Sequence, residues 1–420
     1  MKARVITMGC KVNQAESAEV INYLTEAGFQ LGGAGCAEAV VLNTCAVTGR
    51  AEREALSLLR RLRRLNPGAV IVAMGCLARL RPGFLIGPDL ADAVILEGPE
   101  SLVKYLPPVS VSAEAVVASD LKQRTRALLK VQDGCSCNCA YCTVPLARGP
   151  SRSVLPQKVM EDLKAFLASG YKEIVLTGIH MGHWGQDLEP SRDLAYLLSL
   201  INLTFPYDGQ YRLRLSSLEP LEVPLAWTAL TEYGFLAPHI HAPLQSGSDK
   251  LLKAMGRPYT SDTYRQIILD LVGQTDNLAL GTDVLVGFPG ETDEDFALTC
   301  RFLENLPYSY LHVFPYSSRP GTQAASWPGQ VSSHLKKERV LALKELDQKI
   351  RAKFLLTQYP LKHLALLDNS ADSEGRWKVL TGSYVRAVWA DKEMPTPGTL
   401  NYVRLSPPGK PGCLPEARLW

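Results

Sequence analysis

Three cysteines in one short stretch are the residues of this chain best suited to chemistry. Residues 134–145 read GCSCNCAYCTVP, and Cys135, Cys139 and Cys142 within them form a C-x3-C-x2-C triplet. Thiolates are soft ligands, so three of them on one tight loop can hold three irons of a cubic 4Fe–4S cluster. The fourth iron then has no protein ligand, and an open coordination position is typical of a catalytic metal site rather than a structural one.

Other interpretations of this stretch stay open at this point. Cys137 offers a rival grouping, C-x-C-x2-C, and the thiols could instead hold zinc or belong to a loosely clustered core. An apolar run at 127–131 directly precedes the triplet and predicts a buried strand. A strand that ends in such a loop favours the iron–sulfur interpretation.

A second group of cysteines recurs at the ends of predicted strands. These are Cys10, Cys45 and Cys76, which follow the predicted strands Arg4–Met8, Ala39–Leu42 and Ala69–Met74. Parallel strands bring their carboxyl ends to one edge of a sheet, beside helix N-termini that favour a thiolate. One buried cysteine alone is most often part of a core. Three in the same position favour a second three-thiolate cluster, whereas Cys36, Cys300 and Cys413 are interpreted as structural.

The elements around the second group predict an α/β domain over residues 1–105. Helical patterns at Glu16–Gly28 and Val47–Leu65 alternate with the strands, and Ala93–Leu96 is a fourth strand. Such alternation indicates an open parallel sheet covered by helices. Residues 106–125 carry prolines and serines without clear periodicity, so they are predicted to be a linker.

A longer strand–helix series follows and predicts a central domain over residues 126–358. After the strand at 127–131, further strands are expected at Glu173–Thr177, Tyr211–Ser216, His239–Leu244, Leu278–Val286 and Tyr310–Pro315. Six β/α units fall short of a closed eight-stranded barrel and predict a partial (β/α)6 barrel, open on one side. A long amphipathic helix at Ser333–Gln358 ends it. Isolated histidines at strand positions, such as His180, His239 and His241, are interpreted as hydrogen-bonded structure.

The last segment, residues 361–420, changes to strands without helices. Strands are predicted at His363–Leu367, Trp377–Thr381, Tyr384–Ala390 and Asn401–Leu405. Short strands at close spacing indicate a small β-barrel. Tyr384, Arg386 and Trp389 are expected to be exposed, and a small basic barrel with aromatic side chains can bind RNA by stacking and phosphate contact. A docking domain without RNA fits the same residues.

Composition sets broad limits on the protein class. The chain has 420 residues, of which 46% are apolar and 21% charged, and its net charge is +3, too weak to indicate a nucleic-acid partner. It has no apolar run of membrane-spanning length, and its first residues read as a strand rather than a signal peptide. Ten cysteines in such a chain fit reduced thiols in the cytoplasm better than a secreted disulfide framework. We therefore expect a cytoplasmic protein without a membrane partner.

The triplet resembles the signature of the radical S-adenosylmethionine superfamily. The three-part order of domains resembles the methylthiotransferase family over essentially the whole chain, with the last segment similar to its RNA-binding TRAM module. The branch that modifies N6-threonylcarbamoyladenosine at position 37 of tRNA is the most similar. The residues that carry this likeness are 9–14 (GCKVNQ), 243–248 (PLQSGS), 253–260 (KAMGRPYT) and 312–317 (HVFPYS). Sister branches act on isopentenyladenosine in tRNA or on an aspartate of a ribosomal protein.

The resemblance implies two 4Fe–4S clusters and S-adenosylmethionine. Cys135, Cys139 and Cys142 would ligate the first, catalytic cluster, with Cys137 a bystander. Cys10, Cys45 and Cys76 would ligate the second, which supplies sulfur. The residues expected to contact S-adenosylmethionine are Tyr141, Thr177, Gly178, Ser217, Gln245 and Gly287.

The implied partners are the anticodon loop of tRNA, an external electron donor and an external sulfur donor. The implied product carries a methylthio group on carbon 2 of the adenine. Arg148 and Arg152, beside the triplet, would meet RNA phosphate or the cofactor carboxylate. A rival of another class is a non-catalytic iron–sulfur or zinc RNA-binding protein that uses the same cysteines structurally.

Overall fold

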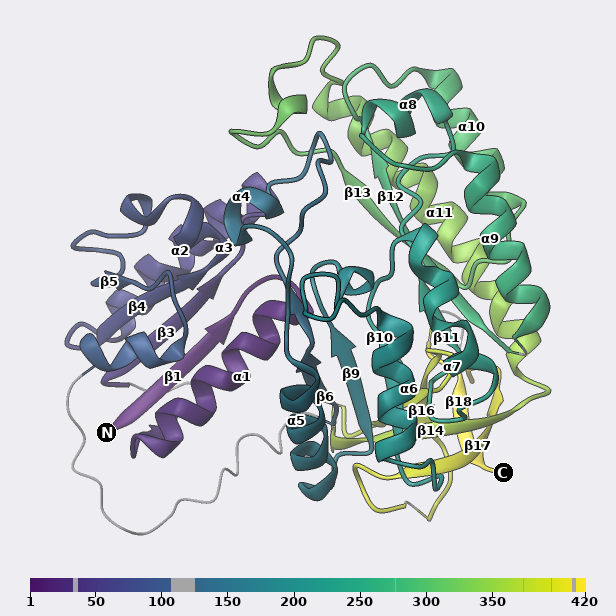
Figure 1. Cartoon of the computed structure of the whole chain (residues 1–420), viewed down its shortest axis with the longest axis horizontal. Coiled ribbons are helices and arrows are strands. Elements are labelled where there is room, and N and C mark those ends of the chain that lie inside the picture. Colours follow the sequence, from purple (N-terminus) through teal and green to yellow (C-terminus); the bar gives the residue numbers. More distant parts are fainter. Residues whose placement is uncertain (33–36, 107–124, 276, 373, 394, 410–412) are drawn as a thin grey trace. The chain divides into compact units, whose positions relative to one another are not determined.

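The structure, a computed structural model, describes residues 1–32, 37–106, 125–275, 277–372, 374–393, 395–409 and 413–420 (Figure 1). Cys36 and most of the predicted linker lie outside these residues. Contacts group the described residues into two compact units. The first unit draws on 1–123, 133–150 and 317–325, and the second on 124–132, 151–316 and 326–420.

A parallel five-stranded sheet forms the centre of the first unit, with strand order β2-β1-β3-β4-β5. Its strands are β1 (Lys2–Thr7), β2 (Gln30–Leu31), β3 (Ala39–Thr44), β4 (Val70–Gly75) and β5 (Ala93–Val94). Its helices are α1 (Lys11–Glu26), α2 (Gly49–Leu65), α3 (Cys76–Leu80) and α4 (Val144–Arg148). The predicted open parallel sheet is confirmed.

Both faces of this sheet are buried, because successive side chains of a strand point to opposite faces. From β3, Val40 and Leu42 pack in one apolar cluster with Leu59 of α2, whereas Val41 packs in another with Leu24 of α1. Helix α1 begins at Lys11, earlier than the predicted Glu16, because Cys10 already takes the extended conformation of an N-cap residue.

Six parallel strands of the second unit form the predicted partial barrel. They are β6 (Ala127–Lys130), β9 (Glu173–Thr177), β10 (Arg212–Leu215), β11 (His239–His241), β12 (Ala279–Val286) and β13 (Tyr310–Pro315). They pair in two sets, β10-β9-β6 and β11-β12-β13, and isolated bridges such as Ser217 to His241 join the sets. The pair β7 (Gln132–Asp133) and β8 (Arg152–Ser153) brackets the cysteine triplet in the sequence.

Helices cover the outside of the partial barrel (Figure 1). They are α5 (Pro156–Ala168), α6 (Leu194–Thr204), α7 (Trp227–Thr231), α8 (Asp249–Ala254), α9 (Ser261–Gln274), α10 (Asp293–Glu304) and α11 (Ser333–Gln358). One continuous apolar core lies between these helices and the strands, and Leu176, Leu215 and Leu280 are fully buried in it. The predicted bounds of β9, β13 and α11 are those of the structure.

The last segment is a closed barrel with strand order β14-β15-β16-β18-β17. Its strands are β14 (Lys362–Ala371), β15 (Trp377–Thr381), β16 (Arg386–Trp389), β17 (Leu400–Ser406) and β18 (Glu416–Leu419). The sequence predicted four of these five. Strand β18 was missed, although it closes the barrel by pairing with both β16 and β17.

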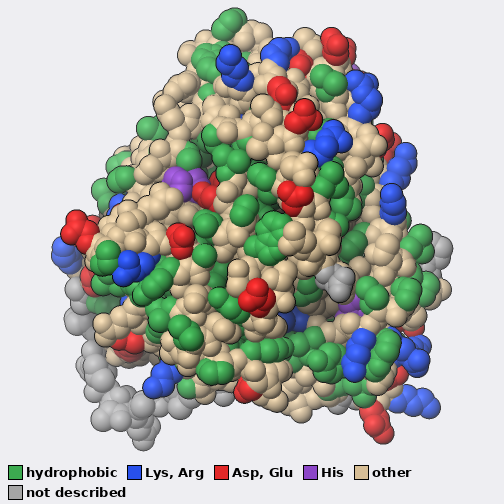
Figure 2. Space-filling model, turned by 45° about the vertical axis from the view of Figure 1, so that its right-hand side comes forward, with side chains coloured by type: hydrophobic (Ala, Val, Ile, Leu, Met, Phe, Trp, Pro, Cys, Tyr) green, Lys and Arg blue, Asp and Glu red, His purple; other side chains and the backbone are tan. Residues whose placement is uncertain are grey.

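Charged side chains of both signs are interspersed over the face shown in Figure 2. This distribution fits the small net charge of +3. Within the part of the chain that the structure describes, no helix has both the length and the apolar character needed to cross a bilayer.

Candidate functional site

The three strand-end cysteines come together at one edge of the first unit's sheet. We call Cys10, Cys45 and Cys76 the sheet-edge cysteines. They follow β1, β3 and β4, which are neighbours in the sheet, so their positions are adjacent. Cys10 is exposed, whereas Cys45 and Cys76 are buried. The group therefore runs from the surface into the sheet edge.

Two glycines allow the chain to come this close to the sheet-edge cysteines. Gly9 and Gly75 have φ angles of 93° and 90°, a left-handed region that favours glycine. A Cβ atom at Gly9 would lie 3.0 Å from the Cys45 sulfur, and one at Gly75 would lie 2.2 Å from an oxygen of Asn43. Both positions therefore require glycine, because a side chain there would be strained and would collide with a neighbouring strand-end loop.

The buried side chain of Asn13 ties the strand-end loops to one another. Its Nδ2 donates hydrogen bonds to the carbonyl oxygens of Met8, at 2.8 Å, and Thr44, at 2.9 Å. Its Oδ1 lies 3.8 Å from the Cys10 sulfur, within reach of the thiol as donor. The amide thus fixes the loops that carry Cys10 and Cys45 relative to each other.

Residues 133–150, here called the cysteine loop, belong to the same unit as the sheet-edge cysteines. The Cys135 amide donates to the Gly149 carbonyl at 3.0 Å, which closes the loop at its base. Gly134, at φ 70°, has no room for a Cβ, which would lie 1.9 Å from the Pro150 carbonyl oxygen. The Ala324 amide also donates to the Ala140 carbonyl at 2.8 Å, so a distant segment supports the loop tip.

Backbone amides already point at two sulfurs of the cysteine loop. The Cys137 amide lies 3.4 Å from the Cys135 sulfur, and the Val144 amide lies 3.4 Å from the Cys142 sulfur. Hydrogen bonds of this kind stabilise thiolate charge and tune the potential of an iron–sulfur cluster. The four thiols at 135, 137, 139 and 142 are all partly accessible. Donor type, access and amide orientation therefore fit a cluster held by this loop.

Arg148 joins the cysteine loop to the sheet-edge cysteines. It ends α4, and its Nε lies 3.2 Å from the Cys76 sulfur. Its Nη1 donates to Glu16 at 2.7 Å and to Asp133 at 2.8 Å, and its Nη2 donates to Asn13 at 2.6 Å. The side chain is fully buried. The predicted contact of Arg148 with RNA phosphate or a cofactor carboxylate is therefore wrong, because its donors are already used inside the unit.

Burial sets the acid–base state of these groups. It raises the pKa of Cys76 to about 11, against the opposing effect of Arg148, and it also raises the pKa of Cys45. Burial by itself would lower the pKa of Arg148, but the carboxylates of Glu16 and Asp133 raise it above its ordinary value. Burial therefore favours the protonated form of both thiols, while the guanidinium beside them stays charged.

The predicted contacts to S-adenosylmethionine fall in both units. Tyr141 lies on the cysteine loop and is half-buried. The other five lie at or just after the carboxyl ends of β9, β10, β11 and β12 in the second unit. They are Thr177, Gly178, Ser217, Gln245 and Gly287. Among these Ser217 is exposed, whereas a Cβ at Gly287 would lie 2.3 Å from Lys336.

Histidines inside the partial barrel belong to a hydrogen-bonded network. The Tyr310 hydroxyl lies 2.8 Å from His239 Nε2 and 3.0 Å from His241 Nδ1. Asp283 then lies 2.8 Å from His241 Nε2 and 3.3 Å from His312 Nδ1. The interpretation of His239 and His241 as hydrogen-bonded structure is confirmed. The roles of Asn13, Glu16 and Arg148 could not be predicted from the sequence, because partners such as Thr44 for Asn13 and Glu16 for Arg148 lie far away along the chain.

Two family descriptions match adjacent parts of the chain. Residues 2–95 match the "Uncharacterized protein family UPF0004", and residues 129–303 match the "Radical SAM superfamily". The first match covers the sheet with the sheet-edge cysteines. The second begins in β6, just before the cysteine loop, and ends in α10.

Several curated proteins are similar over most of their length. The chain is 34% identical to a protein of Bacillus subtilis named threonylcarbamoyladenosine tRNA methylthiotransferase MtaB, over 92% of this chain and 90% of the relative. It is 35% identical to a protein of the same name from Aquifex aeolicus, over 84% and 90%. It is 33% identical to tRNA-2-methylthio-N(6)-dimethylallyladenosine synthase of Pelotomaculum thermopropionicum, over 83% and 82%.

A solved structure shares the fold at low sequence identity. The radical S-adenosylmethionine methyltransferase TsrM from Kitasatospora setae aligns with a TM-score of 0.54 and 14% identity, over 77% of each chain. At this identity the likeness concerns the fold alone.

Proposed function

The chain belongs to the radical S-adenosylmethionine methylthiotransferase family, and we propose that it adds a methylthio group to carbon 2 of N6-threonylcarbamoyladenosine at position 37 of tRNA. The similarity to proteins named for this activity, at 34% and 35% identity over most of both chains, supports the choice of substrate. The target base lies in the anticodon loop and has to leave the base stack to react.

The radical S-adenosylmethionine superfamily implies a 4Fe–4S cluster and S-adenosylmethionine. We propose that Cys135, Cys139 and Cys142 hold this cluster, and that the sheet-edge cysteines hold a second one. When bound, the cluster and S-adenosylmethionine supply the radical chemistry that an unreactive carbon–hydrogen bond requires. The second cluster would carry the sulfur that is transferred, and external donors would supply electrons and sulfur.

The chain's own residues have positioning tasks in this proposal. Asn13 holds the loops of Cys10 and Cys45, and Arg148 places its guanidinium against Cys76. The Cys137 and Val144 amides donate to loop sulfurs and so stabilise them as thiolates. Tyr141, Thr177, Gly178, Ser217, Gln245 and Gly287 remain the proposed contacts to S-adenosylmethionine. Domain limits of 1–105, 126–358 and 361–420 likewise remain a proposal.

One structural observation supports the proposal most. Both groups of thiols belong to one compact unit, and a single side chain, Arg148, reaches from the cysteine loop to the Cys76 sulfur at 3.2 Å. A sulfur-transferring enzyme needs its sulfur source beside its radical source, because the reacting atoms have to meet. A purely structural metal site would not require this proximity.

Metal content and product analysis together test the proposal. Anaerobically reconstituted protein should hold about eight irons per chain, and Cys135→Ala or Cys10→Ala should each lower this to about four. Only the intact protein, given dithionite, S-adenosylmethionine and tRNA, should form the methylthio nucleoside. Cys137→Ser is the matched control within the cysteine loop and should keep both iron and activity.

Each alternative gives a different result in the same assay. Four irons in the intact protein, unchanged by Cys10→Ala, would remove the second cluster from the proposal. Methylthiolation of isopentenyladenosine would redirect the substrate to the sister branch, which the 33% identical relative represents. Stable iron or zinc without any release of 5′-deoxyadenosine would instead favour a non-catalytic RNA-binding protein.

A further inference from the structure

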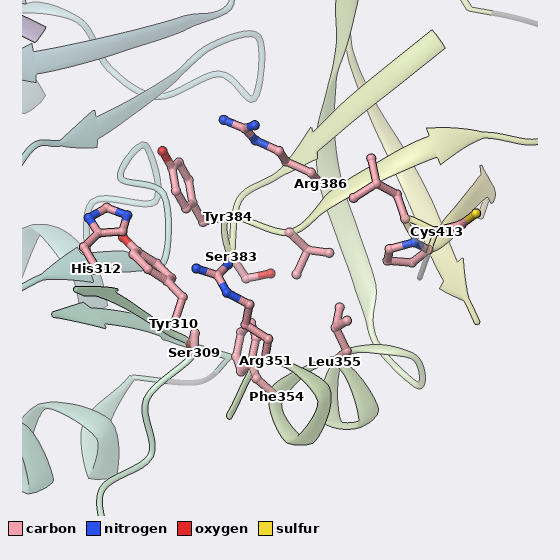
Figure 3. A pocket seen from close by; sticks show the side chains of 13 residues that line it. Ser309, Tyr310, His312, Arg351, Phe354, Leu355, Ser383, Tyr384, Arg386 and Cys413 are labelled. Carbon is pink, nitrogen blue, oxygen red and sulfur yellow. The ribbon is translucent and has the colours of Figure 1, made fainter. Parts of the chain in front are cut away.

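A pocket of about 420 Å³ lies in the second unit, where three elements meet. It is lined by the start of β13, by the last turns of α11 and by the terminal barrel (Figure 3). We call it the seam pocket. Its volume is within the range of small-ligand sites, which is about 300–1,000 Å³.

The seam pocket lies at the opposite end of the strands from the predicted cofactor contacts. Tyr310, which lines it, is the first residue of β13. Gly287, in contrast, directly follows the last residue of β12, the strand that pairs with β13 in parallel. A ligand in the seam pocket would therefore not be the group that reacts at the carboxyl ends of the strands.

The aromatic side of the seam pocket is fixed before any ligand arrives. Tyr384 has a φ of 62°, a left-handed conformation that is unfavourable for a bulky side chain. Such strain persists only where surrounding contacts hold it. The Arg214 guanidinium lies 5.0 Å from the centre of its ring, and the His239 ring lies 4.4 Å away.

The charged side of the seam pocket is positive. Arg351 and Arg386 line it together with His312, and the described lining residues include no carboxylate. Arg386 is exposed, so its guanidinium is accessible to a ligand. Arg351 pairs with Asp347 at 2.7 Å through Nε, and its guanidinium lies 5.3 Å from the Tyr310 ring. Figure 3 shows Arg351, Arg386 and His312 among the side chains that line the pocket.

Aromatic rings beside arginines suit a planar, anionic ligand. Bases stack on aromatic side chains, and arginine binds phosphate through its planar fork of donors. We propose that the seam pocket binds one unpaired nucleotide of the substrate RNA, with its base against Tyr384 and Phe354 and its phosphate at Arg351 and Arg386. This inference rests on the proposed function, and it adds a nucleotide site distinct from that of the modified base.

The test measures binding of a fluorescent anticodon stem-loop RNA to the reconstituted full-length protein. Arg386→Ala should weaken binding about 5-fold and make the salt dependence of the affinity less steep, because one phosphate contact is lost. Arg301→Ala, an exposed arginine of α10 outside the pocket, is the matched control and should change the affinity less than 2-fold. Equal affinities for both variants would overturn the proposal.

A second variant tests whether RNA binds in the seam pocket or on the exposed outer surface of the terminal barrel. Tyr384→Asn removes the ring but keeps a residue that tolerates the left-handed conformation, so the fold should persist. It should weaken RNA binding about tenfold, as expected for the loss of base stacking. Tyr402→Asn removes an exposed ring of β17 instead. Loss of affinity in Tyr402→Asn but not in Tyr384→Asn would place the RNA on the exposed outer surface of the terminal barrel and overturn the proposal.

Ultraviolet crosslinking and competition identify the ligand class. Peptides that contain Tyr384 or Phe354 should crosslink to the RNA, and adenosine monophosphate should compete only weakly. If Tyr384→Asn weakens the binding of adenosine monophosphate but not that of RNA, the pocket is a site for a free nucleotide and the proposal is overturned. Formation of the methylthio nucleoside is measured in parallel with wild-type protein. If the protein forms no such product but still binds RNA through the pocket, only the proposed function is refuted.

Discussion

Two buried ion clusters, one in each unit, use the same chemistry for different ends. In the first unit one cation, Arg148, serves Glu16, Asp133, Asn13 and the Cys76 sulfur. In the second unit one anion, Glu173, serves the arginines Arg126, Arg212 and Arg214. We call these the Arg148 cluster and the Glu173 cluster. Each joins segments that are far apart along the chain.

The Glu173 cluster connects the start of the barrel strands to the terminal barrel. Arg212 and Arg214 contact Glu173 at 2.5 Å and 3.0 Å, and all three side chains are buried. Their remaining donors reach backbone carbonyls of the terminal barrel, including Leu380 at 2.7 Å and Gly382 at 2.9 Å. Among the described residues, the hydrogen-bond acceptors of these two arginines are oxygens of Glu173 and backbone carbonyls. The cluster is therefore suited to a structural role, in which it holds the partial barrel and the terminal barrel together.

The Arg148 cluster differs because one of its partners is a thiol. Cys76 is a proposed metal ligand, so the guanidinium that fastens the cysteine loop also sets the electrostatic environment of that sulfur. The Glu173 cluster thus has a structural role, whereas the Arg148 cluster combines a structural role with an effect on a proposed metal ligand. The comparison predicts that breaking the Glu173 cluster costs stability alone, whereas breaking the Arg148 cluster also changes the metal site.

The largest expected effect is on stability, from Glu173→Gln. The change leaves Arg212 and Arg214 buried without their counter-charge, which typically costs about 3–5 kcal/mol. The free energy of unfolding in urea measures it. Glu232→Gln, an exposed glutamate after α7, is the control and should stay within about 0.5 kcal/mol of wild type. A loss below about 1 kcal/mol would show that the backbone carbonyls alone compensate the arginines.

The second prediction concerns Arg148→Met, which should cost about 3 kcal/mol, at the lower end of the range for a broken buried pair, because it leaves the buried Glu16 carboxylate unpaired, whereas Asp133 is partly accessible and can be hydrated. It should also leave the iron bound by the sheet-edge cysteines more labile to chelators, with little change at the cysteine loop. Time-resolved chelation of the reconstituted protein measures this difference. Arg53→Met, an exposed arginine of α2, is the matched control. Unchanged chelation rates would show that the Arg148 cluster has a structural role only, like the Glu173 cluster.

The third prediction is a pH dependence that belongs to the Glu173 cluster. Burial alone would raise the pKa of Glu173, but Arg212 and Arg214 hold it well below its ordinary value of 4.5. A depressed folded-state pKa adds stability that is fully present above the unfolded value and is lost as the pH falls below it. The stability gap between wild type and Glu173→Gln should stay constant from pH 8 to about 5, then shrink by up to about 1.4 kcal/mol per pH unit. Urea unfolding at several pH values measures this gap, and a gap that grows in acid would contradict the arrangement.

The smallest effect is expected from Arg126→Ala. This arginine reaches Glu173 only at 3.5 Å and its side chain is about one-third exposed. Partly exposed pairs are worth about 0–1 kcal/mol, so the loss in unfolding free energy should stay within that range. A larger loss would mean that the third arginine is an equal member of the cluster.

The sequence predicted the elements well and the clusters poorly, for one physical reason. Strands such as β9 and β13 are apolar runs between polar or glycine-rich turns, so their bounds can be read locally. Strand β18 has only four residues and little apolar character, and its place is decided by the strands it pairs with. Short segments of this kind depend on tertiary contacts.

The ion clusters lack any local pattern. Arg148 precedes Gly149, a pattern that predicts an exposed loop. Its burial could not be predicted locally, because its partner Glu16 lies 132 residues away. The triplet and the strand-end positions of the sheet-edge cysteines were visible, because spacing and recurrence are properties of the sequence. Their connection through Arg148 and Asn13 was not, because it exists only in the folded unit.

The first unit is assembled from three pieces of chain, and the last of them, residues 317–325, lies in the final quarter of the sequence. Its parallel sheet can begin to fold while the ribosome is still translating, since domains generally fold from the N-terminus during synthesis. The cysteine loop, however, stays without its support at Ala324 until that piece has emerged. The cluster proposed for this loop is therefore expected to gain its full protein support only after about three-quarters of the chain has been made.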